Sequence, residues 1–212
     1  DLIEMCKHVA LVTGERPWLN AGVLSHNDLD LLKPYIEGVL APIETANRQV
    51  YKEICPKKSI TPLITMLNET PTKRGINIIL GVGERLSDID DLFAFMKNNQ
   101  IRRVMFQIPT VRSEGNEPPS SFYIARWIAE TRIAFPNCEI IAATHFSRAA
   151  EVSLFLKAGA NEITGFPAVS LFNSEAAKII TQEAQNAGRF LMSNLTETNA
   201  LRTLTRVNAD QE

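Results

Sequence analysis

Short apolar runs alternate with helical segments along this chain, and that alternation limits the folds it can adopt. Runs with the length and branching of buried strands lie at 38–41, 76–80, 104–108, 139–143 and 162–164, and a short strand is expected before them at 17–22. Helical spacing is found between them, at about 27–33, 48–54, 63–68, 89–98, 122–135, 148–157 and 174–187. Strands that alternate with helices form a parallel sheet whose crossovers are helices. We therefore predict an α/β fold.

The number of strands predicts an incomplete barrel. A closed eight-unit (β/α) barrel takes about 250 residues, so six units take roughly 190. The chain of 212 residues fits six such units and a tail. Because no stretch rich in Gly, Ser or Pro divides it, we predict one domain over 1–212, with its core at 17–190 and a tail at 191–212. The polar part of that tail, from Thr196, is expected to be a weak helix or a loose end.

Charge and hydropathy exclude two classes of partner. The 22 basic and 24 acidic residues give a formal net charge of −2, and no stretch of the sequence is strongly basic. Because nucleic-acid binding normally needs a basic patch, nucleic acid is not expected as a partner. No apolar run approaches the roughly 18 residues of a membrane span, and a signal-peptide pattern is missing. We expect a cytoplasmic protein that acts on a small molecule.

The sequence contains no recognisable metal or nucleophile motif. Cys6, Cys55 and Cys138 are odd in number and widely spaced, which indicates free thiols rather than disulfides. The polar run at 25–30 is a helix-capping box rather than a metal site. Cys-x-x-Cys, His-Glu-x-x-His and Gly-x-Ser-x-Gly motifs are all missing. We predict no metal ligands in these residues and leave the catalytic residues unassigned.

The run Gly81-Val-Gly83-Glu84 directly follows the expected strand at 76–80. It is not a dinucleotide fingerprint, because Leu86 stands where a third glycine would pack helix against strand. Two interpretations remain open. The glycines let a ligand approach the backbone at the carboxyl end of a strand, where parallel α/β folds place their active sites. Alternatively, they form a tight turn before a helix capped by Ser87.

Two other polar pairs follow expected strands. Glu44-Thr45 lies just beyond the strand that ends near Ala41, and a carboxylate there can accept both hydroxyl groups of a ribose. A solvated loop glutamate is the alternative. Thr144-His145 follows the strand at 139–143, where the histidine is a candidate general acid or base, or simply a polar residue at the mouth.

Taken together and in order, several segments resemble the radical S-adenosylmethionine superfamily, in the branch of biotin synthase, methylornithine synthase and the hydrogenase-maturase radical enzymes. The resemblance runs from about Pro17 to Phe166. It is most specific in Ile133-Ala-Phe-Pro-Asn-Cys-Glu-Ile-Ile-Ala-Ala-Thr and the following 156–161. The other segments that carry it are Leu19-Asn-Ala-Gly22-Val-Leu-Ser25, Ile43-Glu44-Thr45, Tyr51-Lys-Glu-Ile54, Ile79-Leu-Gly81-Val-Gly83-Glu84 and Ala158-Gly159-Ala160-Asn161.

The resemblance implies a barrel of βα units that holds a [4Fe-4S] cluster on a Cys-x-x-x-Cys-x-x-Cys loop. S-adenosylmethionine binds that cluster and is cleaved to a 5′-deoxyadenosyl radical, which abstracts hydrogen in cofactor or amino-acid biosynthesis. By position, Glu44 resembles the ribose-binding acid, and Gly81, Gly83 and Glu84 resemble the glycine motif of the adenosine site. Gln107 to Pro109 would lie near the adenine. Gly22 resembles a glycine at the end of a strand, and Thr144 and His145 are candidates for substrate contact.

Several departures from the family pattern are also visible. The cluster motif is missing, because the resemblance begins near the family's third strand and the first two units would precede Asp1. Where relatives often carry an arginine for the methionine carboxylate, this sequence has Leu63. The positions that match the second-cluster ligands of biotin synthase are Trp18 and Ile140 or Ile141, which disfavours sulfur insertion.

Six of eight units would leave two unpaired sheet edges, which the protein must cover. Three hypotheses account for this. The chain is the C-terminal portion of a longer radical enzyme, which is the preferred one. It is a non-catalytic accessory subunit that completes its barrel with a partner chain. Or it is an unrelated α/β enzyme whose Gly81 turn binds phosphate at a helix N-terminus.

Overall fold

The computed structural model describes residues 2–109 and 118–196. Its sheet has six strands, as the sequence predicts, and they begin within three residues of the expected positions. The strands are β1 (Trp18–Leu19), β2 (Gly38–Glu44), β3 (Lys73–Ile79), β4 (Arg103–Gln107), β5 (Glu139–Ala143) and β6 (Glu162–Thr164). The predicted α/β class is therefore confirmed.

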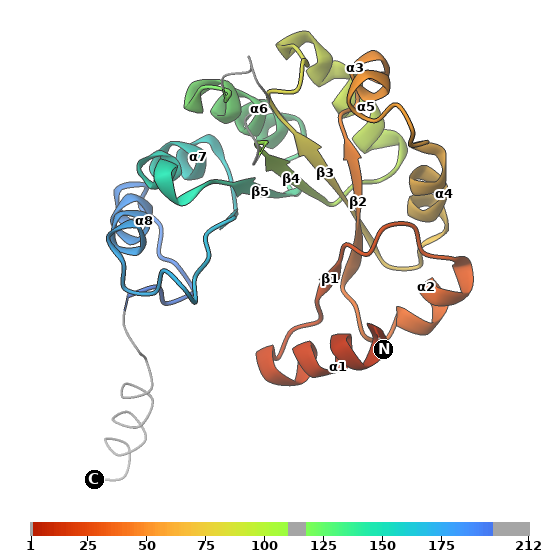
Figure 1. Ribbon diagram of the computed structural model, residues 1–212, viewed down its shortest axis with the longest axis horizontal. Coiled ribbons are helices and arrows are strands. Elements are labelled where there is room, and N and C mark those ends of the chain that lie inside the picture. Colours follow the sequence, from red (N-terminus) through yellow and green to blue (C-terminus); the bar gives the residue numbers. More distant parts are fainter. Residues whose placement is uncertain (1, 110–117, 197–212) are drawn as a thin grey trace.

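All the strands run parallel, and their order in space is their order in the chain, from β1 to β6. Such an order curls a sheet in one direction, and Figure 1 shows the strands as an open arc with helices α2 to α8 on its convex side. The arc is a half-barrel, so the predicted partial barrel is confirmed. Among the described strands, β1 and β6 are the two edges.

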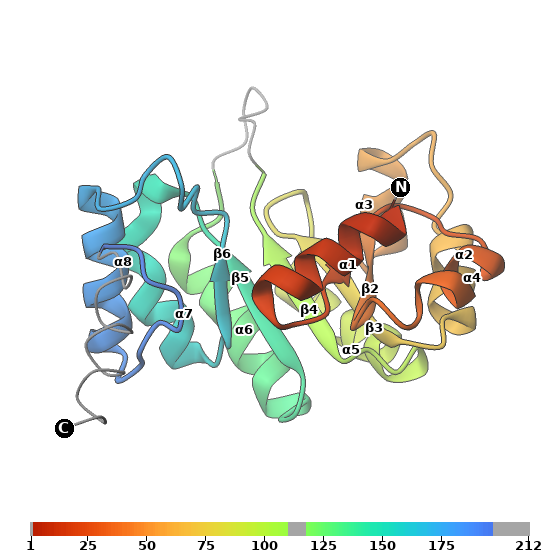
Figure 2. The same cartoon turned by 90° about the horizontal axis from the view of Figure 1, so that it is seen from below.

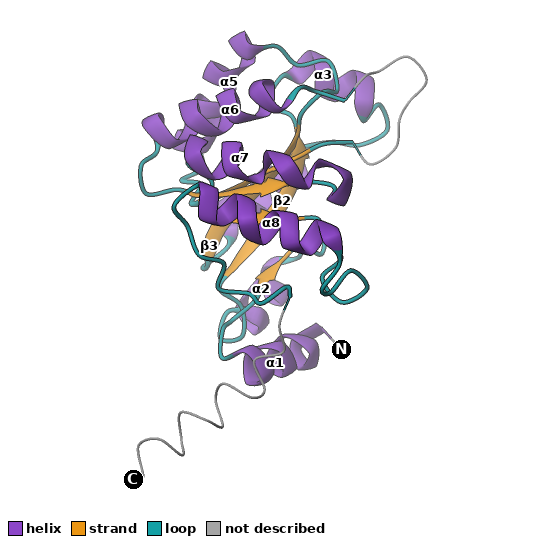
Figure 3. Cartoon of the chain, turned by 90° about the vertical axis from the view of Figure 1, so that its left-hand side faces the viewer, coloured by secondary structure: helices purple, strands orange, loops and turns teal. Residues whose placement is uncertain are grey.

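The helices occupy the predicted intervals. Figure 3 shows α7 and α8 in front of the sheet, on its outer side. The α-helices are α1 (Leu2–Thr13), α2 (His26–Leu32), α3 (Arg48–Ile54), α4 (Thr61–Glu69), α5 (Ile89–Asn98), α6 (Ser121–Ala134), α7 (Val152–Ala158) and α8 (Glu175–Asn186). Two short 3₁₀ segments precede α5 and α7: η1 (Leu86–Asp88) and η2 (Phe146–Glu151).

Three local expectations need correction. The strand expected at 17–22 has only two residues, because the chain turns at Gly22 with φ of 77°. Ser87 lies inside η1 and caps nothing, since α5 follows Asp88 without a side-chain cap. His145 rather than Ser147 caps the segment before α7.

The core lies between the convex face of the sheet and the helices. Alternate strand residues point to opposite faces, and one set from each central strand packs in a single apolar cluster with helical side chains. Leu29, Leu67, Leu92, Ile128 and Phe155 are among the helical members, and each is at most 1% exposed. The members from the strands, with Leu80 directly after β3, are Val39, Ala41, Ile43, Ile76, Ile78, Leu80, Val104, Phe106, Ile140 and Ala142. The opposite set lines the concave interior.

Helix α1 lies beside β1, at the rim of the open side; it is below the sheet in Figure 1 and in front of it in Figure 2. Cys6 faces the core, whereas Met5, Leu11 and Val12 are between 63% and 82% exposed. No helix among the described residues is long and apolar enough to cross a membrane. Most of the expected tail, at 197–212, lies outside the described residues.

Candidate functional site

Parallel strands end at one edge of the sheet, and this edge gathers most of the predicted site residues. Glu44 ends β2 and Gln107 ends β4. Gly81 is the second residue after β3, and Thr144 directly follows β5. The register aligns Glu44 with Ile78, and the Leu80 amide donates to the Gln107 carbonyl at 2.8 Å. We call this edge the mouth. Gly22 lies on the same side, in the loop after β1.

Glu44 is the most unusual residue of the mouth. It belongs to β2 rather than to the loop beyond it, which corrects the expected position, and it follows a register shift at Pro42. Its φ is 62°, in the left-handed region that residues other than glycine seldom adopt. No hydrogen bond or ion pair reaches its half-buried carboxylate within the described residues.

The electrostatics of Glu44 follow from that burial. Loss of solvent raises the pKa of the carboxyl group above its ordinary value, and the charge of Lys58 opposes the rise. The neighbouring Tyr51 is 7% exposed, and burial raises the pKa of its phenol as well. A desolvated acceptor without a partner is a group that a ligand with two hydroxyls can satisfy.

Glu84 holds the turn after β3. Its Oε1 accepts from the Gly81 amide at 2.7 Å, and its Oε2 accepts from the Val82 amide at 2.9 Å. The Tyr123 hydroxyl donates to the Glu84 carbonyl at 3.2 Å and ties the turn to α6. Both carboxylate oxygens therefore already have partners. The same two amides would be needed for phosphate, so the turn is poorly suited to phosphate binding.

The two glycines of this turn serve different purposes. Gly81 has φ of 89°, and a β-carbon on it would lie 2.6 Å from Cδ of Pro119. Gly83 has φ of 116°, and the nearest atom to a β-carbon there would be 3.8 Å away, on Val50. Gly81 thus allows the chain before α6 to pack closely. Gly83 leaves open space beside the backbone, as a ligand would need.

Gln107 and Thr144 complete the inner wall of the mouth. The side-chain amide of Gln107 donates from Nε2 to Sδ of Met105 at 3.2 Å. Pro109 follows as an exposed residue and borders the undescribed segment 110–117. Thr144 is 3% exposed and its amide donates to the Thr164 carbonyl at 2.9 Å.

His145 is exposed and has a local role. Its Nδ1 lies 2.8 Å from Oγ of Ser147 and accepts from the Ser147 amide at 3.3 Å, and its ring stacks on Phe146 with centroids 3.9 Å apart. Nε2 is the ring nitrogen left outside these contacts. His145 therefore caps the helical segment that follows it, and only its Nε2 is available for a contact at the rim of the mouth.

A polar recess of about 380 Å³ opens beside Gly83. The Asn47 amide donates to Asp88 at 2.9 Å across its base, so the start of α3 is joined to the turn before α5. Neither residue was predicted from the sequence, where the only signal was that each precedes a helix. The lining residues are Asn47, Gln49, Val50, Glu53, Gly83, Arg85, Ser87 and Asp88.

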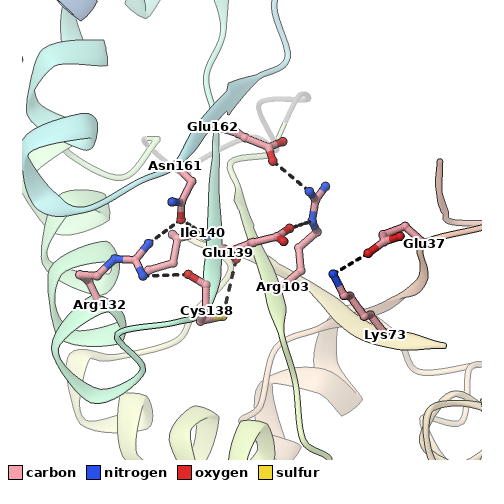
Figure 4. A network of polar contacts seen from close by, with 9 residues as sticks. All are labelled: Glu37, Lys73, Arg103, Arg132, Cys138, Glu139, Ile140, Asn161 and Glu162. Carbon is pink, nitrogen blue, oxygen red and sulfur yellow. Dashed lines mark hydrogen bonds and ion pairs between the residues drawn. The ribbon is translucent and has the colours of Figure 1, made fainter. Parts of the chain in front are cut away.

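At the opposite end of the half-barrel, charged side chains meet in the interior (Figure 4). Arg103 donates from Nε to Glu139 at 2.6 Å and from Nη2 to Glu162 at 2.9 Å. Its guanidinium lies 4.5 Å from the centre of the Trp18 ring. We call these four residues the floor. It joins β1, β4, β5 and β6 below the mouth, and it was not predicted from the sequence.

Two glycines make room for the floor. A β-carbon on Gly38 would lie 2.5 Å from the Trp18 ring, and one on Gly75 would lie 3.0 Å from it. The indole therefore fills the interior at the start of β2 and β3. Ile140 faces the helices in the apolar core, so neither it nor Trp18 offers a metal ligand there.

No three His, Cys, Asp or Glu side chains gather to hold a metal ion in the described part of the chain. Cys6 and Cys138 are buried and Cys55 is half-buried, each as a free thiol. Burial raises the pKa of Cys138 to about 11 and also raises the pKa of Cys6. Both thiols are therefore largely protonated at neutral pH.

No family model matches the chain. Two relatives are uncharacterized proteins of Methanocaldococcus jannaschii. One is 30% identical over 209 residues, which cover 95% of this chain and 57% of the relative. The other is 26% identical over 173 residues, which cover 77% of this chain and 46% of the relative. The chain thus spans about half the length of the curated relatives it matches.

Solved structures share the fold at low sequence identity. Methylornithine synthase (PylB) superposes with a TM-score of 0.72 at 17% identity, over 91% of this chain and 63% of that one. HydG, a maturase of the [FeFe]-hydrogenase, superposes with a TM-score of 0.65 at 13% identity, over 76% of this chain and 41% of HydG. A putative phosphonomutase from Burkholderia cenocepacia J2315 superposes with a TM-score of 0.53 at 12% identity, over 89% of this chain and 92% of that one. These likenesses define a class, the TIM-type partial barrels.

Proposed function

We propose that this chain forms part of a radical S-adenosylmethionine enzyme and supplies the adenosine side of its site. The observation that carries the proposal is the unpartnered, half-buried carboxylate of Glu44 at the mouth, beside the turn of Gly81 to Glu84. It lies in a half-barrel whose fold resembles those of methylornithine synthase and HydG. The same residues carry the sequence resemblance to that superfamily.

The residues fit the nucleoside portion of S-adenosylmethionine. Glu44 would accept the ribose hydroxyls, which would give its carboxylate the partners it lacks. Gly83 would let the ligand approach the backbone, and Glu84 would hold the turn in place. Gln107, Pro109 and Gly22 would border the adenine and the inner wall, while Thr144 and His145 would contact the substrate. When bound to its iron–sulfur cluster, S-adenosylmethionine supplies a 5′-deoxyadenosyl radical for hydrogen abstraction.

The described residues do not fit the [4Fe-4S] cluster itself. Cys6 and Cys138 are buried in the apolar core, and no cluster of possible ligands exists among the described residues. The cluster would therefore be bound by residues outside the described ones. The roles proposed for these residues, in binding the nucleoside and the substrate, do not require them to bind iron.

Closure of the barrel is part of the same proposal. The edges β1 and β6 have unpaired backbone groups, and α1 presents Met5, Leu11 and Val12 to solvent at the rim beside β1. Further βα units, either in the same polypeptide or in a partner chain, would pair with both edges and cover this apolar face. A non-catalytic accessory chain that completes a barrel with a partner is the second candidate, and the same exposed face favours it.

The intact mass of the native polypeptide from its source cell separates these candidates. A mass several kilodaltons above 23.6 kDa, with a cysteine-rich loop in the added sequence, is expected for the radical enzyme. A native chain of this mass that co-purifies with a partner would favour the accessory subunit and overturn the first candidate.

A further inference from the structure

A second recess lies at the opposite end of the sheet from the mouth. It has a volume of about 480 Å³ and opens where β2, β3 and β4 begin. This size is within the range of small-molecule sites. Its charged lining residues are Arg16, Lys33, Glu37, Lys73, Arg74 and Arg102. We call it the basic recess.

Glu37 neutralises only part of that charge. It accepts from Arg16 at 2.8 Å and pairs with Lys73 at 2.5 Å (Figure 4). No carboxylate within the described residues forms an ion pair with Lys33, Arg74 or Arg102. Three cationic side chains, at the end of α2, in β3 and just before β4, therefore line one recess without a charged partner.

Helix ends provide a structural reason for some of these cations. Helices α2, α4 and α5 all end at this recess, and Arg74 donates to the Asn99 and Asn68 carbonyls at 3.2 and 3.3 Å. Each helix C-terminus carries roughly half a negative charge, so the three together offset about one and a half cations. Five cations and one carboxylate leave more positive charge than that. A bound anion would offset the remaining positive charge.

We propose that the basic recess binds a small molecule through a diphosphate group. Guanidinium groups present paired donors that match the oxygens of a phosphoryl group, and a diphosphate can reach cations on several elements at once. Gln100 and the hydroxyl of Thr72 add neutral donors to the lining. The recess is separate from the mouth, so this inference is independent of the proposed function.

Calorimetric titration of the chain with inorganic pyrophosphate tests the proposal. We expect saturable binding at low salt that weakens as salt is added, because the contacts are ionic. The double variant Lys33→Gln/Arg102→Gln should lose at least about tenfold in affinity, since both side chains are charged donors to the anion. The matched control Lys157→Gln removes an exposed lysine from the last turn of α7, outside the recess, and should bind like the parent.

Three outcomes would overturn the proposal. The first is no saturable heat at low salt. The second is a loss of about threefold in the Lys157→Gln control, which is half of the tenfold effect on the free-energy scale, because binding would then depend only on the number of charges removed. The third is competition by a glutamate peptide as effective as pyrophosphate, because carboxylates would then suffice. Glu44→Ala should leave pyrophosphate binding unchanged, which keeps this test separate from that of the mouth.

Discussion

The guanidinium of Arg103 lies 4.5 Å from the centre of the Trp18 ring, although β1 and β4 are separated by two other strands. The contact is possible because Gly38 and Gly75 stand between them without side chains. Arg103 also bridges Glu139 and Glu162, so one cation links the first strand of the half-barrel to its last two. The open arc is therefore braced through its interior as well as by its helices.

Arg103→Met should destabilise the fold by about 1–2 kcal/mol. The Arg103 side chain is 15% exposed and its partners are 39% and 48% exposed, so the pairs lie between surface and buried ion pairs in strength. The stacking on Trp18 adds about 0.5–1 kcal/mol to that loss. Urea denaturation measures the change. Arg126→Met is the control, because its pair with Glu130 on α6 is exposed and should contribute under about 0.5 kcal/mol. Equal losses in both variants would contradict the bracing role.

The three thiols should differ in reactivity toward a disulfide reagent. With its pKa at about 11, Cys138 is a thiolate in only about one molecule in a thousand at pH 8, and it is 5% exposed. Cys6 is 3% exposed with a raised pKa. Cys55 is half-buried and should give the single fast phase in the native protein, which Cys55→Ser should abolish. Rapid labelling of all three would mean that the core around Cys138 is open.

Glu44→Gln should stabilise the protein, and the gain should depend on pH. Because burial raises the pKa of Glu44 above its unfolded value of 4.5, the folded state holds its proton more tightly. Stability is therefore lost as pH rises from 4.5 through the raised pKa, and the amide avoids that loss. In thermal unfolding, Glu44→Gln should have a higher midpoint than the parent at neutral pH. Below pH 4.5, where Glu44 is protonated in both the folded and the unfolded state, its ionisation should cause no difference between the two midpoints. A variant that is less stable at neutral pH would show that Glu44 has a structural partner.

Glu84→Ala should loosen the turn after β3. It removes two acceptors from the Gly81 and Val82 amides, and hydrogen bonds to charged groups contribute about 1.5–3 kcal/mol each when they are buried. Because the site is only half-buried, we expect a total loss of about 1–3 kcal/mol in chemical denaturation. Glu53→Ala on α3 keeps the turn intact and should stay within about 0.5 kcal/mol of the parent. If the two variants lose the same stability, the carboxylate of Glu84 does not hold the turn.

The positions of the strands and helices were predictable from the sequence, whereas the side-chain contacts inside the half-barrel were not. Apolar runs such as 139–143 coincide with strands because helix-facing residues must be buried, and burial is visible in hydropathy. The mouth was predictable for the same reason: residues just after parallel strands share one edge. The exception was Glu44, whose strand continues three residues beyond Ala41 through a register shift that no local pattern signals.

The floor and the basic recess could not be predicted from the chain alone. Trp18, Arg103 and Glu162 are far apart in sequence, and their contact depends on sheet curvature and on the register of four strands. The cations of the basic recess come from four separate stretches of the sequence, near residues 16, 33, 73–74 and 102, so the fold makes a basic cluster that the sequence does not show. His145 shows the opposite error: a histidine singled out for chemistry is held by a local cap.

The most direct test of the proposed function is whether the native polypeptide cleaves S-adenosylmethionine. The protein would be purified without oxygen, supplied with iron and sulfide, and incubated with S-adenosylmethionine and a reductant, and the 5′-deoxyadenosine formed would be quantified. We predict that 5′-deoxyadenosine forms, and that Glu44→Ala weakens the affinity for S-adenosylmethionine about tenfold through the loss of its ribose contacts. A native protein that binds a cluster but yields no 5′-deoxyadenosine would contradict the account.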